Sequence, residues 1–391
     1  MSFWRKMDAN LGNGRKNNVM DHTPTLSIII PVFNQWSYTK ACLEALATTI
    51  PQHITHEILV IDNASTDETA AGLQAWQTKL PSLRIERCET NTGFSPACNR
   101  GAELSRGTYL VFLNNDTVPQ SGWVEPLLTE IEQPGVGMVA PKLVSTDTYS
   151  INHAGYVFGA GAFYGIYQDR PSNLPGANKK RDYQALLGAC LLLRRELFFS
   201  LGSFSLLGLE DIDLCLKIKT SGLVNRYVPQ SVLIHHGSVT LNNSEPGSFP
   251  VTETANFGQR WSTDHVTWDD YLFYLEDGEW PEPPPDPHET AKTVATRSIH
   301  TLIEGYLALN SQRPEEALTK AHESLSLWPH NPMAYLLYCT LLLEAGRTQE
   351  AITELTRIGD YSFYPGLLAH LFPIVSEILP PEIVRKIALQ T

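Results

Sequence analysis

The feature that most constrains the fold is a regular alternation of apolar runs and amphipathic stretches that begins at Leu26. The apolar runs cover 26–33, 56–61, 83–87, 108–113 and 136–140, and the stretches with helical spacing cover 37–49, 66–79, 94–105 and 122–132. Strands that alternate with helices predict an α/β domain with a doubly wound, mostly parallel sheet.

The pattern loosens between Val144 and Tyr183 into Gly, aromatic and polar residues, which predicts functional loops. It then returns as an apolar run over 185–193, helices over 194–201 and 209–220, and a late strand over 232–234.

The acidic, proline-rich segment 280–287 predicts a stiff linker, and a second module follows it. Small and apolar residues recur there at a spacing of 34 residues: Gly305, Ala308 and Ala317 are matched by Cys339, Leu342 and Ala351. That period resembles tetratricopeptide repeats, and an ordinary helical bundle is the alternative. Two repeats are few for a free-standing solenoid, so the tail to Thr391 supplies capping helices or the module packs on the first domain.

Composition narrows the class of protein. The 391 residues are 42% hydrophobic and 18% charged, as in a globular protein, and a net charge of −13 disfavours nucleic acid as a partner. No apolar stretch is long enough to span a bilayer, and no secretion signal is recognisable. The six cysteines are scattered and form no CxxC pair, which favours reduced thiols in a cytoplasmic protein over zinc or disulfides.

Polar segments follow four of the predicted strands, and in a doubly wound sheet such strand ends converge on one crevice. The segments are 31–34, 62–67, 91–94 (leading to a helix with Asn99) and 114–116. Structural alternatives exist for each: Ser65 with Glu68 forms a capping box, Gly93 permits a tight turn, and 114–116 is only a turn. Asn99, unfavourable within a helix, requires a specific hydrogen bond.

A fifth segment places Glu210, Asp211 and Asp213 at the start of an amphipathic helix. Helix amino termini favour acids, but three carboxylates exceed what capping requires. One of them is suited to act as a general base toward a hydroxyl.

These five segments together resemble family 2 glycosyltransferases with the GT-A fold, closest to a rhamnosyltransferase-like branch, from about Leu26 to Thr240. The matching motifs are Ile29–Asn34, Asp62–Asp67, Asn91–Phe94, Leu113–Asp116 and Glu210–Leu214. The resemblance implies a nucleotide-sugar pocket formed by Pro31, Phe33, Asn34, Asp62, Ser65, Gly93, Asn99, Asn114, Asn115 and Glu210.

The resemblance also implies the reacting groups. Residues 114–116 stand at the DxD motif, with Asp116 as ligand of a divalent cation, Mn²⁺ or Mg²⁺, and Asp211 as catalytic base. His235 matches the family's late histidine near the metal, and His236 is the other candidate. Two departures are Asn114 in place of the first acid, and Ser205 where relatives often carry an aspartate.

We therefore expect a flexible leader (1–24), a GT-A glycosyltransferase domain (25–270), an acidic linker (271–295) and tetratricopeptide-like repeats (296–391). The expected activity is inverting transfer from a dTDP- or UDP-sugar to a hydroxyl acceptor, in cell-surface polysaccharide or glycoconjugate synthesis. A hexosyl or rhamnosyl group would pass to a glycan, a lipid-linked glycan or a protein. The expected location is the cytoplasm or, peripherally, the inner face of the membrane, and the repeats would bind a protein partner or a second copy.

Two alternatives stay open. One is a non-catalytic scaffold built on a decayed transferase domain with a repeat-based interaction module. The other is a sugar nucleotidyltransferase, but that class needs a Gly-rich basic loop after its first strand, where this chain reads Pro-Val-Phe-Asn-Gln-Trp.

Overall fold

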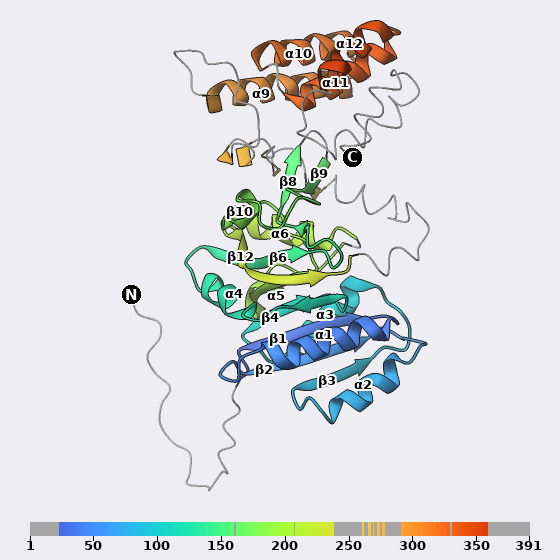
Figure 1. Ribbon diagram of the computed structural model, residues 1–391, viewed down its shortest axis with the longest axis vertical. Helices are drawn as coiled ribbons and strands as arrows, with labels where there is room; N and C mark the ends of the chain where they lie inside the picture. Colours follow the sequence, from blue (N-terminus) through green and yellow to red (C-terminus); the bar gives the residue numbers. More distant parts are fainter. Residues whose placement is uncertain are drawn as a thin grey trace.

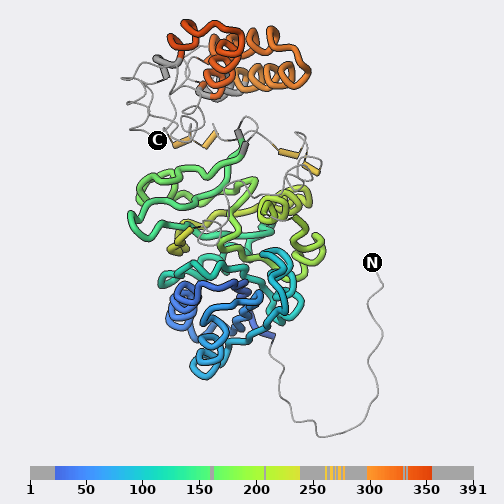
Figure 2. The backbone as a smooth tube through the Cα atoms, turned by 90° about the vertical axis from the view of Figure 1, so that its right-hand side faces the viewer, coloured from blue at the N-terminus to red at the C-terminus, as the bar shows by residue number. Residues whose placement is uncertain are grey.

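The computed structural model describes residues 23–159, 162–206, 208–237, 291–328 and 331–358, together with residues 260, 261, 265, 266, 269, 272, 273, 276 and 277. It shows an α/β body and, at one end of it, a layer of helices (Figures 1 and 2). The expected leader, the proline-rich run 280–287 and the tail from 359 lie outside the described residues, so the domain boundaries stay predictions.

The α/β body is built on a ten-stranded sheet, in which eight strands follow the order β10-β12-β6-β11-β4-β1-β2-β3, while β5 pairs with β12 and β7 pairs with β6 outside this order. β1 (Leu26–Val32), β2 (His56–Asp62), β3 (Leu83–Arg87) and β4 (Tyr109–Leu113) are parallel to one another where they pair. The long ladder between β6 (Val136–Val144) and β12 (Val224–His235) is also parallel. These ladders confirm the predicted α/β sheet.

The remaining strands run antiparallel. β11 (Cys190–Arg194) lies between β4 and β6, and β10 (Arg181–Tyr183) borders β12. β5 (Thr117–Pro119) pairs with β12, and β7 (Ile151–His153) pairs with β6. A separate hairpin joins β8 (Tyr156–Gly159) to β9 (Ala162–Gly165). The antiparallel direction of β11 could not be predicted from the sequence, because apolar periodicity does not indicate which way a strand runs in the sheet.

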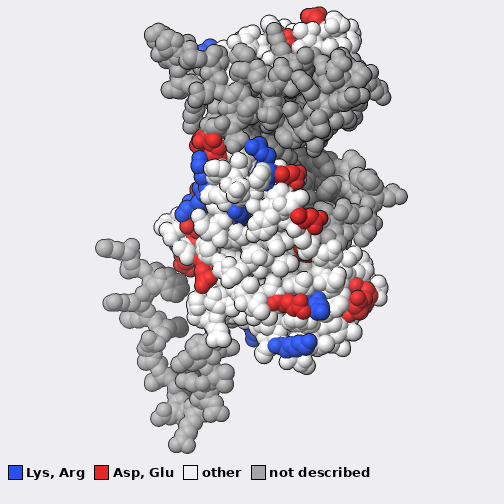
Figure 3. All heavy atoms as spheres, in the orientation of Figure 1, with Lys and Arg blue, Asp and Glu red and all other residues white. Residues whose placement is uncertain are grey.

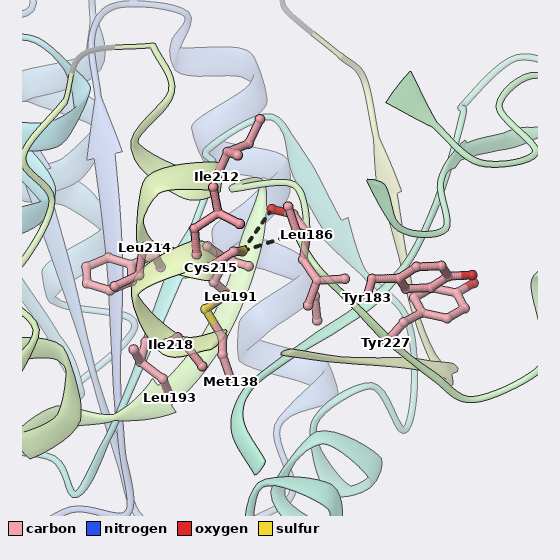
Figure 4. Packing of buried hydrophobic residues seen from close by; sticks show 14 of the residues in the cluster. Met138, Tyr183, Leu186, Leu191, Leu193, Ile212, Leu214, Cys215, Ile218 and Tyr227 are labelled. Atoms are coloured by element: carbon pink, nitrogen blue, oxygen red, sulfur yellow. Dashed lines mark hydrogen bonds between the residues drawn. The ribbon is translucent and has the colours of Figure 1, made fainter. Parts of the chain in front are cut away.

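Helices cover both faces of the sheet, and alternate residues of each strand point to opposite faces. Ile29, Ile61 and Phe112 belong to one buried cluster, whereas Ile28, Val60 and Val111 belong to another. α3 (Phe94–Leu104), α5 (Arg195–Ser200) and α6 (Glu210–Thr220) contribute to the first. α1 (Trp36–Thr49), α2 (Thr69–Gln77) and α4 (Val124–Ile131) contribute to the second. Figure 4 shows α6 packed through Ile212, Cys215 and Ile218 near Met138 and Leu193.

Three strands, β6, β11 and β12, differ by four residues or more from the predicted bounds. β6 extends to Val144 instead of ending at residue 140. The run from Ala185 becomes a strand only at Cys190, because the amides of Leu187 and Gly188 donate to side chains instead of to a neighbouring strand. β12 is twelve residues long rather than three. Its polar Asn225 breaks the apolar pattern, yet it is buried and donates to the carbonyls of Gln184 and Cys215. The loose region 144–183 holds β7, β8, β9, a 3₁₀ turn (η1, Gly176–Asn178) and β10.

The second layer consists of α9 (Ala291–Asn310), α10 (Pro314–Leu327), α11 (Pro332–Glu344) and α12 (Thr348–Ile358). The 34-residue period is repeated in three dimensions. Arg313 N donates to Ala308 O (2.9 Å), and Arg347 N donates to Leu342 O (2.8 Å) at the matching turn. Ala317 and Ala351 are both fully buried at helix crossings. The predicted tetratricopeptide-like module is confirmed.

The helical layer contacts the α/β body. Tyr164 of β9 and Leu272 pack against the helical core, and Phe273, the next residue, packs against the core of the α/β body. Of the two arrangements left open for the repeats, the described contacts therefore include packing on the first domain. No helix among the described residues is long and apolar enough to cross a membrane. On the face shown in Figure 3, basic and acidic side chains are interspersed.

Candidate active site

The ends of β1 and β2 are joined by side chain to backbone hydrogen bonds. Asn34 has a left-handed φ of 58°. Its backbone N–H donates to Ser65 Oγ (2.8 Å), and its side-chain Oδ1 accepts from Thr66 N (2.7 Å). Helix α2 begins only at Thr69, so the capping-box interpretation of Ser65 is wrong. Ser65 instead binds the turn after β1 through its hydroxyl. Pro31, in the last part of β1, and Phe33, directly after β1, are both partly buried.

Asp62 is 1% exposed at the end of β2. Its Oδ1 accepts from Ser65 N (2.9 Å), and its Oδ2 forms an ion pair with Arg87. Arg87 also donates to Ser65 O (2.8 Å). Sequence reasoning missed Arg87, which ends β3 directly opposite Asp62 in the parallel register.

The segment around Gly93 is held by Asn63, a buried residue that the site prediction omitted. Asn63 donates to Asn91 Oδ1 (2.7 Å) and to Gly93 O (3.1 Å), and it accepts from Thr92 N (3.0 Å). Gly93 has a φ of 89°, a region that glycine reaches without steric cost. The expected hydrogen bond of Asn99 is present, since its amide group donates to Phe204 O (2.9 Å) and accepts from Phe204 N (3.1 Å).

Residues 114–116 follow β4 and point in different directions. Asn115 donates to Thr39 Oγ1 of α1 (3.0 Å), whereas the buried Asn114 Oδ1 has no hydrogen-bond partner among the described residues. Asp116 is 8% exposed, and its Oδ1 lies 3.4 Å from His235 Nε2. Neither of these two buried atoms has a hydrogen-bond partner in the described part of the chain.

The tautomer of His235 follows from Asn152. His235 Nδ1 lies 2.7 Å from Asn152 Oδ1, which only accepts, so Nδ1 carries the proton. In the neutral ring Nε2 then carries a lone pair that faces the Asp116 carboxylate. This arrangement fits a cation between Nε2 and the carboxylate. His236 differs: it is exposed, its Nδ1 contacts Thr146 Oγ1 (3.0 Å), and its ring packs on Tyr38.

Asp116 and His235 would supply two protein ligands to such a cation. The described residues contain no group of three or more His, Cys, Asp or Glu side chains placed to hold a metal. Oxygens of a diphosphate and water would therefore have to complete the coordination shell, which is the usual situation for Mg²⁺ at phosphate sites.

Asp211 lies in the first turn of α6, and backbone amides hold its carboxylate. Oδ2 accepts from Gly188 N (2.8 Å) and Oδ1 from Ile212 N (2.8 Å). Burial raises the pKa of Asp211, although the bond from Gly188 opposes the shift. A Cβ at position 188 would lie 3.1 Å from the Asp211 Cβ, so glycine allows this close approach. The next residue, Ala189, accepts from Asn114 N (2.9 Å), which ties Asp211 to the 114–116 segment.

The two acids that flank Asp211 differ in surroundings. Glu210 Oε2 is buried and has no hydrogen-bond partner among the described residues. Burial is the larger cause and the nearby charge of Asp211 the smaller cause that raise the pKa of Glu210 to about 7. Asp213 is fully buried and bonded to Lys217, Arg260 and Trp261. Of these three acids, Glu210 and Asp211 therefore have raised pKa values, whereas hydrogen bonds from Lys217, Arg260 and Trp261 lower the pKa of Asp213.

Adjacent residues of β7 support both parts of this site, and sequence reasoning missed them. Asn152 orients His235, and the buried His153 accepts from Leu187 N (3.0 Å) in the loop that holds Asp211. Burial, with a further contribution from His235, lowers the pKa of His153 to about 3, so the ring is neutral. Nothing in the loose region 144–183 singled out these two side chains.

The structure thus brings Asn114, the Asp116–His235 pair and Asp211 together around the 187–189 loop and its support from β7, and Glu210 directly precedes Asp211 in α6. Asp62, Ser65 and Asn34 form a second group at the carboxyl ends of β2 and β1, the strands next in order after β4. All lie along one edge of the sheet, and their predicted roles remain predictions.

Comparison with known proteins gives two family matches. Residues 27–198 match the model described as glycosyl transferase family 2, and residues 308–362 match that of the tetratricopeptide repeat. The first match ends before α6 and β12, which carry Asp211 and His235.

Two of the curated proteins similar to this chain come from bacteria. The chain is 29% identical over 240 residues to uncharacterized protein y4gI of Sinorhizobium fredii, covering 58% of this chain and 26% of that protein. It is 32% identical over 233 residues to O-antigen biosynthesis protein RfbC of Myxococcus xanthus, covering 56% and 18%. The chain thus spans about a quarter or less of the length of these relatives.

Among solved structures, GalNAc-T7 with UDP, GalNAc and Mn²⁺ aligns with 55% of this chain and 44% of its own, at 22% identity and a TM-score of 0.46. Mannosyltransferase PcManGT from Pyrobaculum calidifontis, in complex with GDP-Man and Mn²⁺, aligns with 78% and 88%, at 17% identity and a TM-score of 0.42.

Proposed function

We propose that this chain transfers a sugar from a nucleotide-diphosphate donor to a hydroxyl acceptor, with inversion at the anomeric carbon. The proposal is supported by the match of residues 27–198 to glycosyl transferase family 2 and of residues 308–362 to the tetratricopeptide repeat. The observation that carries this proposal is the pair of facing atoms Asp116 Oδ1 and His235 Nε2, 3.4 Å apart, beside the loop that holds Asp211. Neither atom has a hydrogen-bond partner among the described residues.

Asp116 and His235 are the residues that would hold a divalent cation, Mn²⁺ or Mg²⁺. A cation there supplies neutralisation of the negative charge that grows on the leaving diphosphate. Asn152 keeps the His235 lone pair directed at that position, and Asn114 Oδ1 offers an acceptor to a hydroxyl or to a metal-bound water.

Asp211 is proposed as the base. As the acceptor hydroxyl attacks the anomeric carbon, its proton passes to the Asp211 carboxylate and the bond to the diphosphate breaks. Burial raises the pKa of Asp211, which strengthens it as a base, while the amide of Gly188 keeps one oxygen in place. Inversion in one displacement needs one base and no enzyme nucleophile.

The remaining predicted residues suit the nucleotide end of the donor. Pro31, Phe33, Asn34, Asp62, Ser65 and Gly93 line the ends of β1 and β2 and the start of α3. Asn115 and Asn99 hold α1 and the 203–206 loop in position around them.

The biological setting is proposed from the named relative. The similarity to an O-antigen biosynthesis protein supports transfer to a cell-surface polysaccharide or glycoconjugate. A glycan, a lipid-linked glycan or a protein would be the acceptor, and the helical repeats would bind a protein partner or a second copy. Such synthesis would place the protein in the cytoplasm or at the inner face of the membrane.

The test is to incubate the protein with a panel of dTDP- and UDP-sugars and Mn²⁺ and to measure turnover as release of the nucleoside diphosphate. We expect slow donor hydrolysis with at least one sugar, and Asp211→Asn should lower turnover at least about 1,000-fold while donor affinity by calorimetry stays within about threefold. Absence of turnover together with absence of nucleotide binding would favour the non-catalytic scaffold. Wild-type turnover in Asp211→Asn would remove the proposed role of this residue.

A further inference from the structure

A segment that follows the sheet in sequence returns to the helix that carries Asp211. Arg260 Nη1 donates to Asp213 Oδ1 (2.7 Å), and Trp261 Nε1 donates to the same oxygen (3.0 Å). Asp213 lies in the first turn of α6, two residues after Asp211, and its side chain is 0% exposed. Trp261 also packs against the buried cluster to which α6 contributes.

The other contacts of Asp213 cannot fix the helix relative to the sheet. Lys217 (2.8 Å) is one turn further along the same helix, so its bond with Asp213 is internal to α6. Ser205 Oγ donates to Asp213 Oδ2 (3.0 Å) from the adjoining loop, and this hydroxyl also receives hydrogen bonds from Lys217 and Arg260. Arg260 and Trp261 are the described contacts that reach Asp213 from outside the 203–220 region.

The segment that carries Arg260 and Trp261 is itself attached to the α/β body further along. Asp269 accepts from Phe158 N (2.8 Å) and from Gln184 Nε2 (2.7 Å). Asp277 accepts from Lys179 (2.5 Å) and from Arg181 Nη1 (2.7 Å). Because these residues are held on the α/β body, Arg260 and Trp261 can support the first turn of α6.

The charge on Asp213 makes this support strong. Burial alone would raise the pKa of Asp213, but hydrogen bonds from Lys217, Arg260 and Trp261 outweigh burial and lower the pKa. The carboxylate is therefore ionised and depends on these donors, because removing one partner of a buried charge leaves the charge without compensation. The first turn of α6 would have to move to rehydrate Asp213, and Asp211 would move with it.

We propose that Arg260 and Trp261 are positioning residues for Asp211: through Asp213 they hold the first turn of α6 so that the Asp211 carboxylate stays on the amide of Gly188. The role of Asp211 as base rests on the proposed function, but the positioning can be measured without turnover. The functional transferase unit accordingly extends to these two residues, well beyond residue 198.

The experiment measures amide hydrogen exchange in the full chain at the two donors to Asp211, Gly188 and Ile212. In Arg260→Ala we expect exchange at both amides to accelerate at least about tenfold, with the melting temperature lowered by less than about 3 °C. Trp261→Phe keeps the ring packing and loses only the N–H donor, so it should accelerate exchange less. Arg260→Lys keeps the charge and should restore most of the protection.

The matched control is Arg226→Ala, which removes an arginine ion-paired with Asp182 and Glu130, residues remote in sequence from α6. Its exchange at Gly188 and Ile212 should equal that of wild type. In an active preparation, Arg260→Ala should lower kcat about tenfold or more with the KM for the donor unchanged.

The outcomes separate the two proposals. Unchanged exchange at both amides in Arg260→Ala and Trp261→Phe overturns the positioning role, whatever the activity. Faster exchange in a protein that turns over no nucleotide sugar supports the positioning and counts against the proposed function.

Discussion

Two adjacent side chains of β7 serve different parts of the candidate site. Asn152 bonds His235, whereas His153 bonds the 187–189 loop that holds Asp211. Successive residues of a strand point to opposite sides, which allows one short strand to support both groups. Removing a side chain that orients a metal ligand, as Asn152 would orient His235, typically lowers metal affinity or activity 10–100-fold.

The proposed cation site is testable through the two neighbouring histidines. His235→Ala should weaken Mn²⁺-dependent binding of a nucleoside diphosphate by about 10–100-fold, because one of the two proposed ligands is lost. His236→Ala is the matched control and should bind within about threefold of wild type, since its ring contacts Thr146 and Tyr38 instead.

Isothermal titration calorimetry with and without Mn²⁺ measures both variants, together with Asp116→Ala, which should behave like His235→Ala. Equal affinities for wild type and His235→Ala would exclude this residue from the cation site. A larger loss in His236→Ala would assign the role to His236.

Glu210 should make stability depend on pH. Because its folded pKa is raised to about 7 from a usual 4.5, the folded state binds the proton more tightly than the unfolded state. The stabilisation from protonation is therefore present at low pH and is lost as the pH rises from about 4.5 to 7, by up to about 3 kcal/mol.

Glu210→Gln removes this ionisation, so its melting temperature should exceed that of wild type at pH 8 by more than at pH 5. Differential scanning fluorimetry across this range gives the comparison. Glu103→Gln, at a side chain that is 62% exposed, should follow the wild-type profile. Parallel profiles for wild type and Glu210→Gln would show that Glu210 does not carry a raised pKa.

At the scale of single elements, α3 lies directly on the sheet at Gly101. A Cβ at this position would come within 2.4 Å of Ile29 Cγ2, and Ile29 is fully buried in β1. Gly93 precedes the first residue of this helix, and Ser95 lies in its first turn. Ser95 in turn donates to Leu206 O (2.9 Å) in the loop before α6.

Gly101→Ala should destabilise the α/β body by about 1–3 kcal/mol, because the added methyl forces a shift in a packed core. Urea denaturation monitored by fluorescence measures the change. Glu103→Ala, on the exposed side of the same helix, should alter the free energy of unfolding by less than about 0.5 kcal/mol. A neutral or stabilising Gly101→Ala would mean that helix and sheet are free to separate at this point.

At the scale of the whole molecule, the described residues between 260 and 277 contact both layers. Arg260, Asp269 and Asp277 bond to the α/β body, whereas Leu272 packs on the helical core. The charged contacts in the described part of this segment are thus made to the α/β body rather than to the repeats.

A chain ending at residue 290 should therefore keep the melting temperature of the α/β body within about 3 °C. A chain ending at residue 258 should lose at least about 5 °C, because Asp213 and Arg181 lose partners and the buried faces of Trp261 and Phe273 are removed. Calorimetry of both chains tests this. Equal melting temperatures would place the boundary of the transferase unit before residue 258.

Local spacing was enough to predict most of the architecture. The strands from Leu26 to Leu113, the helices between them and the 34-residue period all follow from periodicity, because burial of one face imposes it on each element by itself. The convergence of Asp62, Asn114 and Asp116 on one edge followed from parallel strands, whose carboxyl ends share that edge.

Tertiary structure alone decided the rest. It set the antiparallel direction of β11, the position of His235 rather than His236 beside the Asp116 carboxylate, and the hydrogen bond from Asn34 N to Ser65 Oγ. It also supplied the supports from Asn152, Arg87 and Arg260. These contacts link residues separated by 22 to 119 positions in the chain. Spacing along the sequence reports which face of its own element a residue occupies. It carries no record of which distant donor or acceptor the folded chain brings opposite, so those partners appeared only with the fold.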